Sequence, residues 1–377
     1  MKVIIASDSY KGSCTTLEVA NSIEKGFRKI YKDANFVKIP MADGGEGTVT
    51  ALVIGTNGRY EDIEVIGPLG DLVKARYGII NDNIAIIEMA AASGLTLIER
   101  GKLNPLITTT YGTGQLIKAA LKKGMRKIYV GLGGSGTNDA GLGMAQALGV
   151  SFKDENGNEA GYGGGEIGRI KEIDISNIHP LIKEAEITAI SDVKNPLCGP
   201  NGASYVFGPQ KGATKGMVKM LDDNLKYFSE LIKKSLGKDI LNIPGSGAAG
   251  GLGAGLMAFC NAIIEPGIEK VLDITNMDFH LRDADLVITG EGRIDNQSKY
   301  GKVPVGVAKR ARKFNVPVIA IVGSVGEGAS DVYPFGIDII LDIVNKPMTL
   351  GEAISNANLL IENAGENAAR IYKFKER

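Results

Sequence analysis

The 377-residue sequence contains few of the side chains that build metal centres and disulfide frameworks. Tryptophan is absent, and there are only two histidines, His179 and His280. A His-based triad or metal centre is therefore not expected, and both histidines are predicted to be structural. The three cysteines, Cys14, Cys198 and Cys260, lie far apart without CxxC spacing, which argues against disulfides and a zinc site.

An excess of one charge and long apolar runs are also missing. The 43 Lys and Arg residues balance 43 Asp and Glu residues, so no basic field would recruit nucleic acid or an anionic membrane. No apolar run approaches the roughly 20 residues that a membrane span needs. The first residues, MKVIIASDSYKG, become polar too soon for a signal peptide and are expected to form a strand. These absences predict a cytoplasmic protein without nucleic-acid or membrane partners.

Glycine, in contrast, is abundant. It makes up 51 of the 377 residues, nearly twice the usual share of about 7%. Because glycine is costly inside helices and strands, the excess should lie in loops that need positive φ or a close backbone approach to a ligand. The length of the chain suggests two domains.

Strands and helices alternate at both ends of the chain, which predicts an α/β fold with parallel strands. Thr15 with Glu18, and Thr349 with Glu352, predict capping boxes at the start of two helices. The second helix is expected to be the last one of the chain, with one apolar stripe that runs from Leu350 and Ile354 to Ile371.

Between residues 59 and 89, short β-like runs are separated by Gly and Asp-Asn turns without a helix, which predicts an antiparallel meander. We predict a Rossmann-like parallel α/β domain formed by residues 1–58 and 280–377. A second, mixed α/β domain of residues 59–279, which contains the meander, would interrupt it.

The stretch 283–302, DADLVITGEGRIDNQSKYGK, places carboxylates and several cations in a strand-loop-helix pattern. Leu286 begins a short apolar run typical of a buried strand, and Pro304 stands where a helix would begin. The loop between them lies at the carboxyl edge of a sheet, where open α/β folds bind ligands. Its carboxylates suit a metal and its cations suit an anion, which favours a phosphoryl-transfer site.

Other polar loops follow predicted strands on the same edge. Asp8 and Lys11 follow a strand at 3–7, and Asp43 follows a strand at 36–39. For Asp8 and Asp43 a functional role and helix N-capping are equally compatible with the pattern.

A glycine-rich loop at 131–141, GLGGSGTNDAG, also follows a strand. It matches the dinucleotide pattern GxGxxG, with Asp154 and Glu155 at a distance suited to a ribose, and so leaves a nicotinamide-dependent oxidoreductase as an alternative. Two further matches elsewhere in this glycine-rich chain weaken that evidence. The polar residues of the loop suit a phosphate or carboxylate, or else cap a helix. They are Ser135, Thr137, Asn138 and Asp139.

Asp192 follows a predicted buried strand at 187–191 and stands near Lys194, so it could hold a metal ion. Lys211 could reach an anion, but we expect it to be solvated. The segment 244–255, PGSGAAGGLGAG, permits either close helix packing or the approach of a nucleotide.

Several longer stretches carry a resemblance to a known family. They are DSYKG (8–12), PMADGGEGT (40–48), GLGGSGTNDAG (131–141), SDVKNPLCGPNGAS (191–204), VFGPQKGA (206–213), GAAGGLGAG (247–255) and DLVITGEGRIDNQSKYGKVPVGVA (285–308). In this order they resemble the type 1 glycerate kinase family along essentially the whole chain. Gly136, where the family often has Ala, and Cys14 depart from its pattern, but neither is a charged candidate.

The resemblance implies ATP-dependent phosphorylation of D-glycerate, with 2-phosphoglycerate favoured over 3-phosphoglycerate, and an active site between two domains. No P-loop GxxxxGK[ST] occurs, so ATP must be held in another way. A non-catalytic sugar-phosphate binding protein stays open as a further alternative, as does a homodimer.

The residue types and their loops then predict roles for this reaction. As catalytic residues we predict Asp295, which would accept the hydroxyl proton with Asp43 as second choice, together with Asp192 and Lys11. The predicted Mg²⁺ ligands are Asp192 and Glu291. The predicted substrate-binding residues are Asp8, Ser9, Asp43, Arg293 and Lys302. The predicted nucleotide-binding residues are Gly133, Ser135, Thr137, Asn138 and Asp139.

Overall fold

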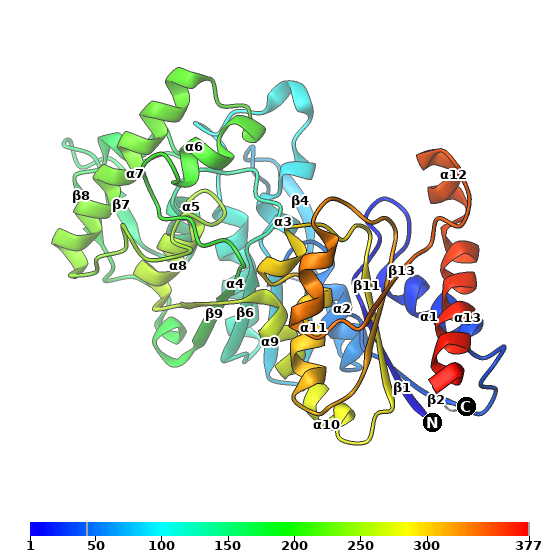
Figure 1. Ribbon diagram of the computed structural model, residues 1–377. Coiled ribbons are helices and arrows are strands. Elements are labelled where there is room, and N and C mark those ends of the chain that lie inside the picture. Colours follow the sequence, from blue (N-terminus) through cyan, green and yellow to red (C-terminus); the bar gives the residue numbers. More distant parts are fainter. Residues whose placement is uncertain (43, 376–377) are drawn as a thin grey trace. The chain divides into compact units, whose positions relative to one another are not determined.

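The computed structural model describes residues 1–42 and 44–375 and divides the chain into two compact units (Figure 1). Unit 1 comprises Met1–Asp43, Thr50–Thr56 and Ile268–Arg377, and unit 2 comprises Gly44–Val49 and Asn57–Gly267. Compared with the predicted domain boundaries, residues 268–279 belong with unit 1, and residues 44–49 and 57–58 belong with unit 2. In unit 1, which contains both ends of the chain, strands alternate with helices, as the sequence predicts.

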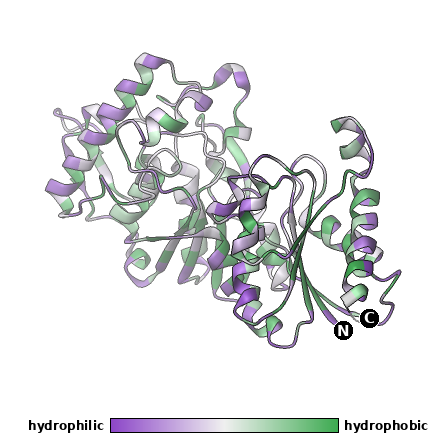
Figure 2. Ribbon diagram, in the orientation of Figure 1, coloured by the Kyte–Doolittle hydropathy of each residue, from purple (hydrophilic) through white to green (hydrophobic). Residues whose placement is uncertain are grey.

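Unit 1 is built on a parallel sheet of five strands in the order β13-β12-β11-β1-β2. The strands are β1 (Lys2–Ser7), β2 (Asn35–Lys38), β11 (Leu286–Glu291), β12 (Val318–Val322) and β13 (Ile339–Asp342). The inner strands β1, β11 and β12 are almost entirely buried, which explains their unbroken apolar runs (Figure 2). The predicted parallel α/β architecture is confirmed.

Two helices cover one face of this sheet. α1 (Thr16–Phe27) and α13 (Ala357–Lys375) pack on each other and form one hydrophobic core with alternate residues of β1, β11 and β12. The predicted capping box at the start of α1 is present, because Thr15 and Glu18 exchange side-chain and backbone hydrogen bonds. α11 (Val303–Arg312) lies on the opposite face in Figure 1.

The prediction of one long C-terminal helix is wrong. The chain forms α12 (Leu350–Ser355) and α13, and the backbone leaves the helical region at Asn356, with φ −105°. The capping box of Thr349 and Glu352 is confirmed. Leu350 and Ile354, expected on a buried stripe, are 77% and 41% exposed. The apolar period continues through the break, but only α13 packs against α1.

Unit 2 contains a mixed sheet of six strands in the order β10-β9-β6-β5-β4-β3. The strands are β3 (Arg59–Ile66), β4 (Leu72–Ile80), β5 (Ile84–Glu88), β6 (Lys127–Gly131), β9 (Glu186–Ile190) and β10 (Ile263–Glu265). The pairs β3-β4 and β4-β5 are antiparallel, which confirms the predicted meander, and the remaining pairs are parallel. A separate two-stranded sheet joins β7 (Ser151–Lys153) and β8 (Glu172–Asp174).

The helices of unit 2 pack around one large core, in which Phe152, Phe228 and Phe259 contact one another. These helices include α4 (Tyr111–Lys122), α5 (Leu142–Ala147), α6 (Ala203–Phe207), α7 (Lys215–Leu236) and α8 (Leu252–Cys260). A Cβ on Gly255 would lie 2.4 Å from the carbonyl oxygen of Ala140, so the glycine-rich segment before and within α8 serves close packing. Within the described residues, no helix is long and apolar enough to cross a membrane.

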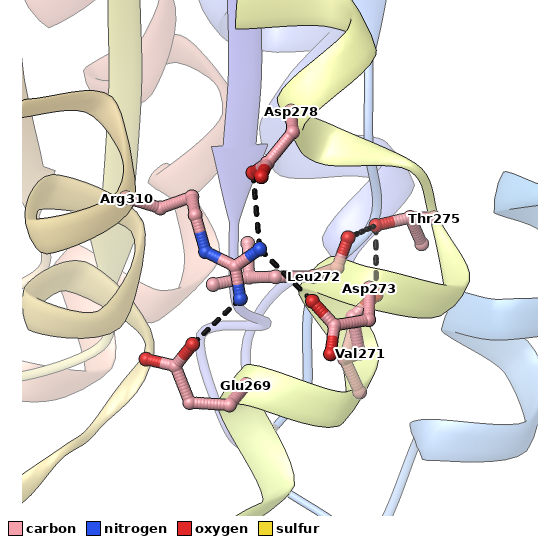
Figure 3. Close-up of polar contacts among 7 residues, drawn as sticks. All are labelled: Glu269, Val271, Leu272, Asp273, Thr275, Asp278 and Arg310. Carbon is pink, nitrogen blue, oxygen red and sulfur yellow. Dashed lines mark hydrogen bonds and ion pairs between the residues drawn. The ribbon is translucent and has the colours of Figure 1, made fainter. Parts of the chain in front are cut away.

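Arg310 of α11 fastens two short helices of unit 1, α9 (Gly267–Ile274) and α10 (Met277–Leu281) (Figure 3). Its guanidinium donates hydrogen bonds to three carboxylates: Glu269 (2.6 Å), Asp273 (2.9 Å) and Asp278 (3.0 Å). The side chain of Arg310 is 9% exposed, whereas those of the three acids are 46–57% exposed. One buried cation therefore holds three acids that would otherwise repel one another.

Replacing Arg310 with methionine should lower the free energy of unfolding by about 2 kcal/mol, because three neighbouring carboxylates lose their cation. This decrease in the free energy of unfolding should be smaller than for a fully buried ion pair, because the side chains of the three acids are about half exposed. Urea unfolding of Arg310→Met and of Arg370→Met measures the difference. Arg370 forms a surface ion pair with Glu366 on α13, and its loss should lower the free energy of unfolding much less than the loss of Arg310. Equal effects of the two substitutions would contradict a special role for Arg310.

Candidate active site

Two polar loops follow neighbouring parallel strands of unit 1. β1 pairs with β11 so that Ser7 lies beside Gly290, and the next residues along the two strands are Asp8 and Glu291. The N–H of Asp8 donates to the carbonyl oxygen of Gly290 at 2.9 Å, which keeps the loops together. This is the carboxyl edge of the sheet, where open α/β folds bind ligands. Two of the predicted carboxylates thus stand at adjacent strand ends.

Glu291 is the buried carboxylate of this edge, with an exposed fraction of 7%. Its Oε1 accepts a hydrogen bond from the Ser298 hydroxyl at 2.5 Å, and its Oε2 lies 3.6 Å from Nζ of Lys302 at the start of α11. Burial raises the pKa of Glu291, and Ser298 and Lys302 offset only part of that rise. Asp8 and Asp295 raise it further by like-charge repulsion. Three carboxylates and one ammonium therefore interact at this edge.

The loop after β11 is held against the loop after β12. The N–H of Gly326 donates to the carbonyl oxygen of Ile294 at 2.7 Å. Asp295 accepts the N–H of Gln297 at Oδ1 (2.9 Å), and its Oδ2 lies 3.3 Å from Nε of Arg293. The side chain of Arg293 is 66% exposed, so it can contact a ligand while it orients Asp295.

The loop after β1 supplies the remaining residues predicted in unit 1. The Asp8 carboxylate accepts the N–H of Ser9 at 2.6 Å, which shapes the turn. Tyr10 is buried, and its hydroxyl donates to a carbonyl oxygen of β12 at 2.7 Å, which fixes the loop on the sheet. Lys11 is exposed next to this anchor. Asp43, the last predicted substrate residue, lies outside the described residues.

Unit 2 has a polar edge of its own, where β5, β6 and β9 end. Glu88, the last residue of β5, accepts the N–H of Val49 at 2.7 Å and so holds segment 44–49 at this edge. Burial raises the pKa of Glu88, and the backbone N–H groups of that segment lower it only in part. A Cβ on Gly133 would lie 2.5 Å from the Cα of Gly45, so this position requires glycine for the two loops to approach.

Asp139 caps the elements around it. Its carboxylate is fully buried and accepts the N–H and the hydroxyl of Thr110, both at 2.8 Å, and the N–H groups of Gly141 and Gly143. Burial raises the pKa of Asp139, and these four hydrogen bonds lower it. The helix-capping alternative is therefore favoured for Asp139.

The other polar residues of the same loop are also largely buried. Asn138 and Thr137 have exposed fractions of 0%, and Ser135 has 9%. The side-chain amide of Asn138 donates to the Ser204 hydroxyl at 3.3 Å. The Thr137 hydroxyl oxygen has no hydrogen-bond partner within the described part of the chain. Ser135 is thus the most accessible of the predicted nucleotide-binding side chains.

The prediction that Lys211 is solvated is wrong. Lys211 has an exposed fraction of 1%, and its ammonium donates to Ser135 Oγ at 2.8 Å and to the carbonyl oxygen of Thr137 at 2.6 Å. Burial lowers the pKa of Lys211 to about 7, and Asp139 opposes this shift. The sequence cannot show this burial, because the loop that covers Lys211 is 76 residues away.

Asp192 follows β9 in unit 2 and is exposed, and its Oδ1 accepts the N–H of Gly267 at 3.0 Å. Among residues 1–42 and 44–375, no three His, Cys, Asp or Glu side chains are grouped so that they could hold a metal ion. Asp192 belongs to unit 2 and Glu291 to unit 1. That these two carboxylates share one Mg²⁺ stays a prediction.

The dinucleotide-binding alternative is wrong. The fingerprint requires its acidic residue at the end of the second parallel strand of a βαβ unit. Here β7 leads to Asp154, but it pairs antiparallel with β8 in the small separate sheet. The Asp154 carboxylate accepts the N–H groups of Asn156 and Asn158 and so closes a turn.

Comparison with known proteins identifies the family. A model described as the glycerate kinase family matches residues 3–373. This chain belongs to the glycerate kinase family. It is 51% identical to the glycerate 2-kinase of Escherichia coli K12 over 370 residues. These residues make up 98% of this chain and 97% of the relative. A glycerate kinase of Halalkalibacterium halodurans shows the same identity and coverage. A crystal structure described as a glycerate kinase 2 from Salmonella typhimurium LT2 is 47% identical in sequence and has a TM-score of 0.91. The superposition covers 100% of this chain and 99% of the Salmonella chain.

In this glycerate kinase family member, sequence reasoning missed two side chains that hold the polar edges, Ser298 and Glu88, and predicted the wrong environment for a third, Lys211. Ser298 binds Glu291, Glu88 fixes segment 44–49, and Lys211 binds the 133–139 loop. The role of Ser298 could have been predicted, since Ser298 lies in the same charged stretch, 283–302, as Glu291. The sequence gives a weaker indication for Glu88, because it is a charged residue at the end of an apolar strand.

Proposed function

We propose that this chain transfers the γ-phosphoryl group of ATP to the 2-hydroxyl group of D-glycerate. The observation that carries the proposal is the 51% identity over 370 residues to the glycerate 2-kinase of E. coli. The charged edge of unit 1 supports it, because phosphoryl transfer depends on positioning and on neutralising charge rather than on covalent chemistry.

Within unit 1, Asp295 accepts the proton of the glycerate hydroxyl as the hydroxyl oxygen attacks the γ-phosphorus and the bond to ADP breaks. Arg293, 3.3 Å from Asp295, orients this carboxylate and offers donors to the substrate carboxylate or the moving phosphoryl group. Lys302 and Lys11 add positive charge at the same edge. Asp8, Ser9 and Asp43 complete the substrate site.

The carboxylates of this chain fit a magnesium ion. Glu291 accepts one hydrogen bond and faces one ammonium, and a carboxylate has about four lone-pair positions, so it keeps acceptor capacity. Asp8 adds negative charge next to it. We assign Glu291 and Asp192 as Mg²⁺ ligands; few protein ligands suffice, because Mg²⁺ keeps several waters and binds substrate phosphates. When bound, the ion would neutralise charge on the phosphate oxygens.

For the nucleotide, the chain has no P-loop, and we assign the loop after β6 instead. The backbone N–H groups around Gly133 and the side chains of Ser135, Thr137 and Asn138 supply hydrogen-bond donors for phosphate oxygens. The buried carboxylate of Asp139 holds this loop in place through its hydrogen bonds to Thr110, Gly141 and Gly143. A cytoplasmic location and a homodimer stay predictions of the sequence.

The test is the ³¹P NMR spectrum of the product formed from ATP and D-glycerate by the purified protein. We expect ADP and a new phosphomonoester resonance split into a doublet, because the phosphorus couples to the single hydrogen on C2. A triplet would place the phosphoryl group on the 3-hydroxyl. Absence of ADP and of any new phosphomonoester would overturn the proposed activity.

Gly326 should be required for the position of Asp295. A Cβ at Gly326 would lie 2.9 Å from Cβ of Asp295 and 3.0 Å from the guanidinium of Arg293, closer than ordinary contacts. The substitution Gly326→Ala should therefore displace Asp295 and lower kcat by about tenfold to a hundredfold. The matched control is Gly351→Ala, where no atom lies within 4 Å of the added carbon. Equal kcat values for the two variants would contradict this role.

A further inference from the structure

Lys211 is a buried cation without a carboxylate partner in the part of the chain that the structure describes. It ends a 3₁₀ helix, Pro209–Lys211, and reaches the loop after β6, where its hydrogen bonds end on Ser135 Oγ and the carbonyl oxygen of Thr137. Asp139 acts on it only through electrostatic attraction and forms no ion pair with it. A buried charge is costly, so a lysine kept in this place calls for a role.

The hydrogen bonds of Ser135 fix the direction of its hydroxyl proton. An ammonium group can only donate, so the Ser135 oxygen must accept from Lys211. The hydroxyl proton of Ser135 then needs another acceptor, and within residues 1–42 and 44–375 this hydroxyl donates no hydrogen bond. Among the described residues, the Ser135 hydroxyl is therefore a donor without an acceptor, and a neighbouring positive charge polarises it.

The loop around Ser135 is already rigid without a ligand. The Thr108 hydroxyl donates to the carbonyl oxygen of Gly136 at 3.0 Å, and the N–H of Gly136 donates to the carbonyl oxygen of Ser93 at 2.9 Å. These bonds hold the backbone but do not touch the Ser135 hydroxyl. The hydroxyl oxygen of Thr137, two residues further along the chain, is a second polar group without a hydrogen-bond partner among the described residues.

We propose that the Ser135 hydroxyl donates a hydrogen bond to an anionic oxygen of a bound substrate and that Lys211 acts through Ser135 as a positioning residue. The inference rests on the proposed function, which supplies two anionic groups of this chemistry, a nucleotide phosphate and the glycerate carboxylate. Lys211 does not touch the ligand. Its ammonium holds Ser135 in the orientation that presents the proton to the oxyanion.

This role makes ligand affinity depend on pH. The pKa of Lys211 is lowered to about 7, so the lysine is protonated below pH 7 and loses its proton above it. The neutral amine can accept the Ser135 proton, which turns the hydroxyl away from the ligand. Asp139, in the same loop, is the charged group that acts on Lys211, and it favours the protonated form. Affinity for the anion should therefore fall as pH rises from about 6 to about 8.5.

Calorimetric titration of the full-length protein tests the proposal, with ATP and D-glycerate titrated separately so that binding is measured without turnover. Ser135→Ala should weaken the binding of one of them by about tenfold to a hundredfold, since a hydrogen bond to a charged group is lost. Loss for ATP alone identifies a phosphate as the partner, and loss for D-glycerate alone identifies the carboxylate. Ser135→Ala should also abolish the fall in affinity between about pH 6 and about pH 8.5.

Lys211→Met should weaken the same ligand, and the double variant Lys211→Met/Ser135→Ala should be no weaker than Ser135→Ala alone. A lysine with only a structural role would instead give additive losses. Thr108→Val is the matched control, because it removes a bond that holds the same loop but leaves Lys211 and Ser135 in contact. Its affinities should stay within about threefold of those of the unmodified protein.

If Ser135→Ala binds both ligands as tightly as the unmodified protein, the inference is overturned, even where Lys211→Met fails to fold. That outcome leaves the proposed function standing if ³¹P NMR detects phosphoglycerate. Conversely, loss of ATP affinity in Ser135→Ala, together with no phosphorylation of glycerate by the unmodified protein, would overturn the proposed function and support the role of Ser135.

Discussion

Replacing Asp295 with asparagine should lower kcat for D-glycerate phosphorylation by about a hundredfold to ten-thousandfold. Such a loss is typical when a positioned acid–base group is removed. Asparagine keeps the size of the side chain, and its amide oxygen can still accept the N–H of Gln297, so the loop should keep its shape. An amide cannot take up the hydroxyl proton. Steady-state kinetics, with thermal unfolding to verify folding, measures the effect.

Asp283→Asn is the matched control for Asp295→Asn. Asp283 precedes the amino end of β11, whereas Asp295 follows its carboxyl end, and the Asp283 side chain is 71% exposed and pairs with Lys2. Its kcat should remain within about twofold of that of the unmodified protein, since surface ion pairs contribute little. If Asp295→Asn retains full kcat, Asp295 is not the proton acceptor, and Asp43 becomes the candidate to test.

Replacing Asp192 with asparagine should weaken the apparent affinity for Mg²⁺ by at least about tenfold to a hundredfold and reduce turnover by orders of magnitude at limiting Mg²⁺. Loss of a residue that only hydrogen-bonds to a metal ligand already weakens metal affinity by about tenfold to a hundredfold. A direct ligand should matter at least as much, and a neutral amide is a poorer ligand than a carboxylate for a hard cation. The asparagine amide oxygen can still accept the N–H of Gly267, so unfolding is not expected. The measurement is the Mg²⁺ dependence of kcat at saturating ATP and D-glycerate.

Asp174→Asn is the control for Asp192→Asn in the same unit. The Asp174 carboxylate also accepts one backbone N–H, that of Ser176 at 2.8 Å, but Asp174 is the last residue of β8 in the small separate sheet. The Mg²⁺ dependence should be unchanged in Asp174→Asn. If Asp192→Asn shows the same Mg²⁺ dependence as this control, Asp192 is not a metal ligand.

Local sequence signals predicted most elements of the fold. The apolar run that begins at Leu286 forms an inner strand of a parallel sheet, because both faces of such a strand are covered. The capping boxes at Thr15 and Thr349 are present, since their partners lie three residues away. The meander of β3, β4 and β5 was readable from its short turns.

Side-chain environments were less predictable than the elements. Leu350 continues the apolar period of α13 but is exposed, because a break at Asn356 takes α12 off the core. Asp139 stands in a loop typical of ligand binding, yet its four hydrogen bonds all go to the protein. Lys211 has the composition of a surface residue and is buried.

The sequence alone determined that charged loops follow the strands at residues 3–7 and 286–291, and it indicated the glycerate kinase family. It could do so because apolar periodicity, caps and motif order are properties of neighbouring residues. Only the tertiary structure decided which charged groups are buried and what they bind. Glu88 meets Val49 across 39 residues, and Lys211 meets Ser135 across 76. Desolvation and hydrogen bonding, which set the pKa and the role of each group, depend on such distant partners.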